Sequence, residues 1–190
     1  NNIEYDHADI FENIGEIIKS FSHMIRLIPS DGTIIVNKND LNIKKLLKRG
    51  YWSKLKTVDS VKSSGDFNLV KKKQYMLKFK NKNFLLPQNI IGKHNYINAI
   101  TAIGVCKELK LAINSQIKAL SNFRGVSKRT DLVSEVDGIK VFDDFAHHPT
   151  AIKSSINSIK ETFIGKRLLT VFVPGSDSMR LGARGAQRVP

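Results

Sequence analysis

Apolar side chains with helical spacing alternate with short apolar runs typical of strands along almost the whole chain. The spacing predicts helices over residues 8–26, 41–48, 94–109, 115–121 and 149–162. Strand-like runs lie at residues 33–36, 54–58, 67–70, 75–79, 84–86, 132–136, 139–142 and 168–173. This alternation predicts an α/β fold. The helix over 149–162 is long enough to cross over between two parallel strands.

The stretch FRGVSKRT, residues 123–130, marks a change in the order of these elements. Two helices precede it, and a strand, a turn, a strand, a helix and a strand follow it. We therefore place a domain boundary there, with one domain over residues 1–127 and a second over residues 128–190. The chain begins with Asn1 and not with methionine, and we expect it to be a piece of a longer protein.

Charge and composition limit the partners and the location. The chain has 31 Lys and Arg against 17 Asp and Glu, a formal charge of +14, which favours anionic partners such as nucleic acids, nucleotides or phosphorylated sugars. No apolar run approaches the roughly 18 residues that span a bilayer, so we expect a cytoplasmic protein without membrane contact. Cys106 is the single cysteine, which excludes an intrachain disulfide.

Much of the positive charge lies in the run KKKQYMLKFKNK, residues 71–82. Strand alternation predicts that Lys78, Lys80 and Lys82 lie on one side and the aromatic rings of Tyr75 and Phe79 on the other. A surface that binds single-stranded nucleic acid needs its stacking rings and its cations on the same side. The run therefore favours a solvated sheet face, and a basic nucleic-acid-binding module stays as an alternative function.

The first motif, NNIEYDHADIF, places His7 between acidic residues just before a predicted helix. Carboxylates and imidazole together suit a divalent cation. In the alternative, Asp6 or Asp9 caps the helix and His7 is exposed to solvent. The residues alone leave both interpretations open.

Two further motifs contain polar side chains suited to a nucleotide. In GKHNYINAITA, Asn95 and Asn98 share one face of the first helical turn, where their carboxamides either contact an adenine edge or cap the helix. In FRGVSKRTD, Arg129 lies at the predicted domain junction, where it either binds phosphate or is a solvated linker charge. The residues 1–190 contain no GxxxxGK[ST] phosphate loop.

The fourth motif, VFDDFAHHPT, joins a strand to a helix that begins at Pro149. Adjacent strand residues point to opposite sides, so Asp143 and Asp144 cannot both face one ligand. His147 and His148 are adjacent as well, which is poor spacing for two metal ligands on one helix. A carboxylate at the end of a strand can accept two ribose hydroxyls, or it can lie in an ordinary solvated turn.

Taken together and in this order, NNIEYDHADIF, GKHNYINAITA, FRGVSKRTD and VFDDFAHHPTAI resemble the Mur ligase family of ATP-dependent peptidoglycan enzymes. The resemblance implies the C-terminal half of a P-loop-type central ATPase domain, followed by the start of a Rossmann-like C-terminal domain. It also implies ATP and Mg2+ as cofactors. We expect that the 190 residues alone do not turn over ATP.

The forms DHAD and DDFAHHPTAI are similar to the branch of the family that joins UDP-N-acetylmuramate to the murein tripeptide L-Ala-γ-D-Glu-meso-diaminopimelate. That reaction passes through an acyl phosphate and serves peptidoglycan recycling. The alternatives are the branch that adds L-alanine to the same nucleotide sugar and another branch of the same superfamily, such as a folate-type polyglutamate ligase. On this resemblance we expect no nucleic-acid partner.

The resemblance also implies roles for individual residues. His7 matches a Mg2+-site histidine, and His147 matches a histidine that follows the ribose acid in several members, which makes it the candidate catalytic residue. The candidate ATP-binding residues are the adenine-contacting Asn95 and Asn98, the junction Arg129 and the ribose-binding Asp144. Lys128 stands where many members have a second arginine.

Overall fold

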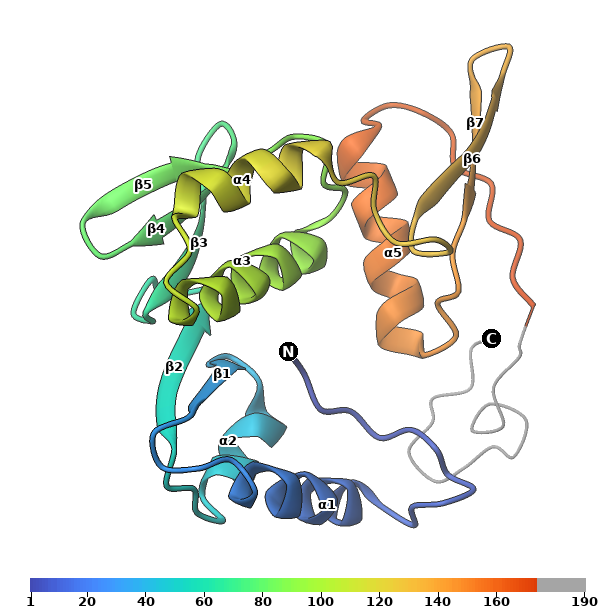
Figure 1. Cartoon of the computed structure of the whole chain (residues 1–190). Coiled ribbons are helices and arrows are strands. Elements are labelled where there is room, and N and C mark those ends of the chain that lie inside the picture. The colour runs from blue at the N-terminus through green and yellow to red at the C-terminus, as the bar shows by residue number, and fades with distance from the viewer. Residues whose placement is uncertain (174–190) are drawn as a thin grey trace.

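A five-stranded sheet in the order β1-β2-β3-β4-β5 organises the first two thirds of the chain (Figure 1). The computed structural model describes residues 1–173. Its strands are β1 (Thr33–Asn37), β2 (Lys54–Asp59), β3 (Phe67–Lys71), β4 (Tyr75–Phe79), β5 (Lys82–Leu85), β6 (Asp131–Val136) and β7 (Ile139–Asp143). Its helices are α1 (Ile14–Arg26), α2 (Leu41–Leu47), α3 (Lys93–Glu108), α4 (Ile113–Asn122) and α5 (Pro149–Thr162).

The sheet is mixed. β1, β2 and β3 pair in parallel, whereas β3, β4 and β5 form an antiparallel meander. Helix α3 lies against β1, β2 and β3 and also contacts α4, while α1 packs on α2. The predicted α/β fold is therefore confirmed, with its parallel strands in the first predicted domain. The antiparallel strands follow from the short turns after β3 and β4, because parallel neighbours need a longer crossover.

Two apolar clusters hold this part together. One joins the sheet to α3, and Phe67, Leu77 and Ile100 are at most 1 % exposed within it. The other joins α1, α2 and β1 through residues such as Ile25 and Ile43. Both clusters come from the apolar positions that repeat in the sequence, because each helix buries one stripe of its surface.

Two predictions are wrong near polar residues, one for the start of the first helix and one for the side of the sheet on which three lysines lie. Helix α1 begins at Ile14 and not at residue 8, because the side chain of Asn13 accepts hydrogen bonds from the backbone N–H groups of Gly15 and Glu16. β4 ends at Phe79 and the chain then turns, so Lys78 alone of the three predicted lysines lies on β4. Lys82 opens β5.

The strand-rich part after residue 128 also differs from its prediction. β6 and β7 form an antiparallel hairpin, and α5 follows as predicted, with His148 as N-cap and Pro149 in the first turn. The predicted strand over 168–173 is absent from the described part of the chain, and its side chains of Leu169, Val171 and Val173 are at least 79 % exposed. A strand needs an edge to pair with. β6 and β7 each keep one unpaired edge, but residues 168–173 pair with neither of them, so the predicted strand–helix–strand unit does not form within residues 1–173.

The rest of the second predicted domain, residues 174–190, lies outside the described residues. Among residues 1–173, the helices are all too short or too polar to cross a lipid bilayer.

Candidate functional site

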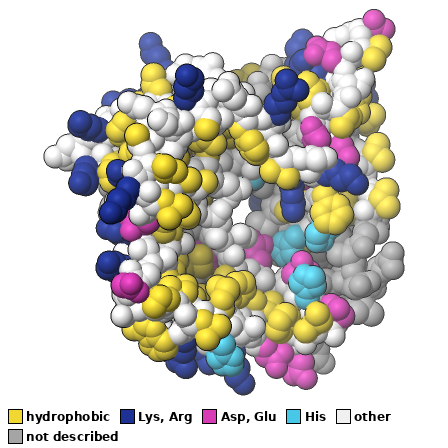
Figure 2. Space-filling model, in the orientation of Figure 1, with side chains coloured by type: hydrophobic (Ala, Val, Ile, Leu, Met, Phe, Trp, Pro, Cys, Tyr) yellow, Lys and Arg dark blue, Asp and Glu magenta, His cyan; other side chains and the backbone are white. Residues whose placement is uncertain are grey.

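The first seven residues run between the start of α3 and the loop that joins β7 to α5. The side chain of Asn1 donates to the Asn98 carboxamide oxygen and accepts from the Thr101 hydroxyl at 2.8 Å. At the other end of the segment, Nδ1 of His148 lies 3.0 Å from a carboxylate oxygen of Glu4. Figure 2 shows histidine side chains next to acidic ones at the rim of a hollow in this face. The N-terminal motif therefore meets two motifs that are distant in sequence.

The two candidate adenine-binding asparagines lie in the first turns of α3. The Asn95 amide donates to the carbonyl of Ile91 at 2.8 Å, and Asn98 is exposed. The N-cap of α3 is Gly92, whose residue type has no capping side chain. The alternative in which an asparagine caps this helix is therefore wrong. The Asn98 carboxamide remains accessible, although Asn1 occupies its oxygen.

Asp144 lies just past the end of β7 and is half-buried. One of its carboxylate oxygens accepts from the backbone N–H and the hydroxyl of Thr130 and from the hydroxyl of Ser155, each at 2.9 Å. The other accepts from the Ala146 N–H at 2.8 Å. This carboxylate ties the junction to α5. The oxygen that accepts from Ala146 has one hydrogen bond and keeps an acceptor site for a ribose hydroxyl, whereas the other oxygen already accepts three.

Arg129 lies on the junction with its guanidinium carbon 5.9 Å from the centre of the Phe145 ring. The Phe145 N–H donates to the carbonyl of Lys128 at 2.8 Å, so the junction and the β7–α5 loop are also joined by their backbones. Lys128 and Thr130 both have positive φ, 57° and 54°. This irregular backbone directs Arg129 and Asp144 to the same region.

His94 is a site residue that the sequence reasoning missed. Its Nδ1 lies 2.9 Å from the Ser154 hydroxyl of α5. Burial lowers the pKa of His94, the nearby Asp144 raises it and the nearby Arg129 lowers it, with a net decrease. The residue lies inside the motif GKHN, two residues after Gly92, and this position at a helix start was the only signal available in the sequence.

The two histidines of the fourth motif have different surroundings. Nδ1 of His147 lies 3.0 Å from the Phe145 carbonyl oxygen, and its Nε2 lies 3.7 Å from a carboxylate oxygen of Asp6. Nε2 of His148 lies 3.2 Å from the Tyr5 carbonyl oxygen. The imidazole of His147 is therefore the one that lies beside the acidic N-terminal motif without capping α5.

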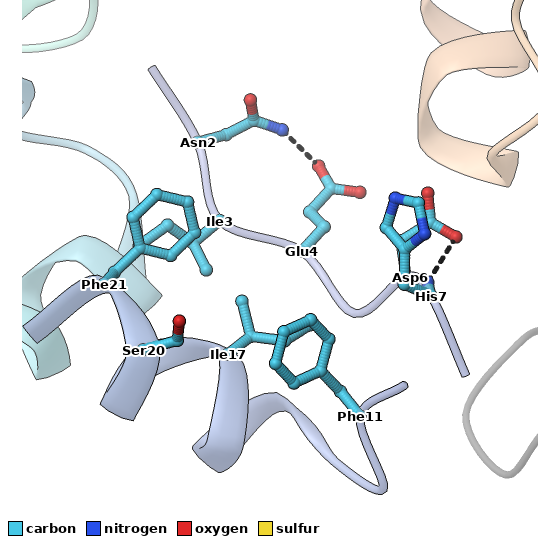
Figure 3. Close-up of a pocket in the computed structure, with 9 residues that line it drawn as sticks. All are labelled: Asn2, Ile3, Glu4, Asp6, His7, Phe11, Ile17, Ser20 and Phe21. Carbon is cyan, nitrogen blue, oxygen red and sulfur yellow. Dashed lines mark hydrogen bonds between the residues drawn. The ribbon is translucent and has the colours of Figure 1, made fainter. Parts of the chain in front are cut away.

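A pocket of about 400 Å³ lies beside the N-terminal motif (Figure 3). Its walls combine an apolar part with the polar side chains of Glu4, Asp6 and His7. His7 is exposed and has a φ of 55°. Because Asn13 caps α1, the alternative in which Asp6 or Asp9 caps that helix is wrong.

The described residues do not by themselves make a metal centre. Within residues 1–173 there is no group of three or more His, Cys, Asp or Glu side chains placed to hold a metal ion. Glu4, which lines the pocket together with Asp6, accepts from Asn2 and contacts His148. His7 can offer a metal one nitrogen ligand from this pocket.

The same regions match known protein families. Residues 1–106 match the model of the Mur ligase middle domain, and residues 128–185 match that of the Mur ligase glutamate ligase domain. The chain is 33 % identical over 188 residues to the UDP-N-acetylmuramate–L-alanyl-γ-D-glutamyl-meso-2,6-diaminoheptandioate ligase of Escherichia coli, covering 96 % of this chain and 40 % of that protein. It is 34 % identical over 180 residues to the UDP-N-acetylmuramate–L-alanine ligase of Clostridium novyi, covering 91 % and 38 %.

Solved structures give the same result. A murein peptide ligase from Psychrobacter arcticus superposes with a TM-score of 0.62 at 30 % identity, over 83 % of this chain and 34 % of that one. A MurF ligase from Thermotoga maritima, in complex with ADP, shares the fold with a TM-score of 0.71 at 18 % identity, over 87 % and 39 %. The chain thus spans about 40 % of the length of the curated relatives it matches. Because the middle-domain model alone matches more than half of the residues, the chain belongs to the Mur ligase family.

Proposed function

We propose that these residues form the nucleotide-facing part of an ATP-dependent ligase that joins UDP-N-acetylmuramate to L-Ala-γ-D-Glu-meso-diaminopimelate through an acyl phosphate. The proposal rests on one observation above all. Four motifs that are far apart in sequence, at residues 1–11, 92–102, 123–131 and 141–152, contact one another around the start of α3. The likeness to the E. coli ligase supports this substrate pair.

Each site residue that the sequence motifs named has a proposed role. Asn95 and Asn98 contact the adenine, because carboxamides both donate to and accept from a base edge. Asp144 accepts the ribose hydroxyls, and Arg129 binds phosphate through its guanidinium. His147 lies beside the acidic segment and contacts the reacting phosphate region as the catalytic residue. The domains divide between residues 127 and 128 in this proposal.

The proposal includes a Mg2+ site, of which residues 1–173 form only a part. His7 supplies one ligand, and the nucleotide phosphates and groups outside residues 1–173 supply the others, because Mg2+ is usually held by a few protein ligands together with substrate phosphates. When bound, the ion neutralises phosphate charge. The protein residues hold the nucleotide and orient it.

Nucleotide binding by the 190-residue chain is the direct test. Calorimetric titration with ATP measures the dissociation constant of the chain, of Asn98→Ala and of a control, Asn83→Ala, which removes an exposed carboxamide from β5. We expect Asn98→Ala to weaken binding by about tenfold, the value of one good hydrogen bond to a base. Equal affinities for all three proteins would contradict the assignment.

The amine substrate separates the two branches of the family. The complete gene product that contains these residues is incubated with ATP, UDP-N-acetylmuramate and either the tripeptide or L-alanine, and phosphate release is measured. We expect release with the tripeptide. Release with L-alanine alone would assign the chain to the other branch, which the C. novyi relative represents. The 190 residues by themselves should bind nucleotide without releasing phosphate.

A further inference from the structure

A second pocket, of about 550 Å³, is lined by the loop after β2, the turn between β4 and β5, and the end of α3. Its volume is in the range of small-molecule sites, roughly 300–1,000 Å³. Its charged lining residues are Lys56, Asp66, Lys78, Lys80, Lys107 and Glu108. None of them belongs to the proposed nucleotide site.

The charges in this pocket do not cancel. Lys56 pairs with Asp66 at 3.2 Å, and the Glu108 carboxylate accepts from the Thr33 hydroxyl at 3.0 Å. Within residues 1–173, no ion pair involves the other three lysines, which are Lys78, Lys80 and Lys107. Four lysines against two acids leave an excess of two positive charges, which suits a phosphate group of about −1.5 to −2 charge better than a single carboxylate.

An aromatic ring shares the pocket with these cations. Phe79 stacks on the buried Phe67 with ring centres 5.0 Å apart, and the ammonium of Lys80 lies 5.7 Å from the Phe79 ring centre. The sequence predicted that rings and lysines lie on opposite sides. That prediction is wrong at this end of β4, because the chain turns at Lys80, with a φ of 52°, and brings its side chain back over the ring.

The pocket is separated from the nucleotide site along α3. Asn98 lies near the start of this helix, and Lys107 near its end. At 1.5 Å of rise per residue the two positions are about 14 Å apart along the axis. Dark blue side chains are also visible along the edge of the molecule that carries β3, β4 and β5 in Figure 2. A ligand in this pocket therefore has its own set of contacts.

We propose that this pocket binds a phosphate-bearing anion, with Lys78, Lys80 and Lys107 around the phosphate and Phe79 as an apolar wall. The phosphate belongs either to a small compound or to the backbone of a nucleic acid. Both sources offer the same group to the lysines, and they differ in how binding depends on length and salt.

Two titrations of the 190-residue chain test this proposal. Calorimetry with inorganic pyrophosphate and anisotropy of a labelled oligothymidylate are run on the wild type, Lys78→Ala and Lys107→Ala. The matched control is Lys73→Ala, which removes the same charge from the turn at the opposite end of β4. We expect about tenfold weaker binding in each pocket variant, the effect of one charge-assisted hydrogen bond, and wild-type binding in the control.

The outcomes separate the sources and can overturn the proposal. If the oligonucleotide binds more tightly than pyrophosphate, and its affinity depends less steeply on salt concentration in the pocket variants, the phosphate belongs to nucleic acid. Equally tight binding of pyrophosphate assigns it to small compounds. No saturable binding of either probe, or an equal loss in Lys73→Ala, overturns the proposal. Lys78→Arg keeps the charge and should bind like the wild type, which separates loss of the cation from loss of the fold.

Discussion

Asp59 is a charged residue that is only 1 % exposed, at the carboxyl end of β2. Its two carboxylate oxygens accept from the backbone N–H groups of Val61, Lys62 and Ser64. Burial alone would raise the pKa of Asp59, but these donors hold the pKa well below its usual range. The carboxylate thereby fixes the loop from which the lysine-lined pocket is partly built.

Replacing Asp59 with Asn should therefore destabilise the chain. Asp59→Asn removes the charge and turns one acceptor into a donor that faces N–H groups, so we expect a loss of about 3 kcal/mol in the free energy of unfolding. Urea unfolding monitored by circular dichroism measures it. Asp31→Asn, at an exposed position before β1, is the control and should change little.

The acid dependence of stability follows from the same residue. The pKa of Asp59 is lower in the folded chain than the ordinary aspartate value of 3.8. Its contribution is therefore complete above about pH 4 and is lost as the pH falls towards the folded value. Stability measured from pH 5 down to pH 2 should decrease less steeply in Asp59→Asn than in the wild type. Parallel curves for the two proteins would contradict this role.

His94 makes the stability of the chain depend on pH in a second, higher pH range. Its pKa is lowered from 6.5 in the folded chain, mainly by burial, so its contribution to stability is present above pH 6.5 and is lost as the pH falls below that value. Arg129→Gln should raise the pKa of His94, and Asp144→Asn should lower it, because each removes one nearby charge. Imidazole resonances followed by NMR through a pH titration measure both shifts. If the pKa of His94 is the same in both variants as in the wild type, then His94, Arg129 and Asp144 do not share one site.

At the scale of elements, the contact between α3 and α5 depends on the absence of a side chain. Gly92, the N-cap of α3, has φ 86° and ψ 141°, a region that other residues rarely adopt. A Cβ built on it would lie 2.3 Å from the Ser158 hydroxyl oxygen of α5. The two helices approach each other closely at this position, which brings His94 and Ser154 within hydrogen-bonding distance.

Gly92→Ala should separate these two helices. The control is Gly50→Ala, because Gly50 has a similar φ of 98° but nothing within 4 Å of the added carbon. Both variants place an alanine at an unfavourable φ, and Gly92→Ala also overpacks the contact between the helices. We therefore expect Gly92→Ala to lower the free energy of unfolding by about 1–3 kcal/mol more than Gly50→Ala does. Chemical unfolding of both proteins measures the difference. An equal cost would show that the helices adjust without strain.

The elements also show what the sequence could and could not predict. Helix α5 starts where Pro149 predicted, and β4 has the predicted bounds, because the signals there are local. The predicted strand at 168–173 does not form, because strand pairing depends on contacts between residues distant in sequence, which no local signal reveals. The contacts of Asn1 with Asn98 and of Glu4 with His148 could not be predicted from the sequence either. The motifs named most of the candidate residues, but the fold alone decides which of them meet.

For the molecule as a whole, the N-terminal segment connects the sheet-containing part to α5. Its contacts with His148 come from Glu4 and the carbonyl of Tyr5. Removing the carboxylate charge should loosen the start of α5 while leaving the apolar clusters intact. The whole molecule is therefore held together by polar contacts at this point, in contrast to the buried packing around β3.

Glu4→Gln tests this connection. We expect faster hydrogen exchange at the start of α5, by a factor of about 5 for the loss of roughly 1 kcal/mol from a partly exposed pair. Exchange in β3 and β4 should stay the same. Glu12→Gln, an exposed acid just before α1, is the control. Unchanged exchange in α5 would mean that the segment does not hold it.

The hairpin of β6 and β7 exposes apolar side chains along most of its length. Leu132, Val133, Val136, Ile139 and Val141 are 48–69 % exposed. Apolar strands of this kind invite association between copies, and here the formal charge of +14 opposes it by mutual repulsion. Salt screens that repulsion but does not weaken the apolar attraction. Colloidal stability of the chain therefore depends on ionic strength, and light scattering should increase with added salt while the secondary structure stays unchanged.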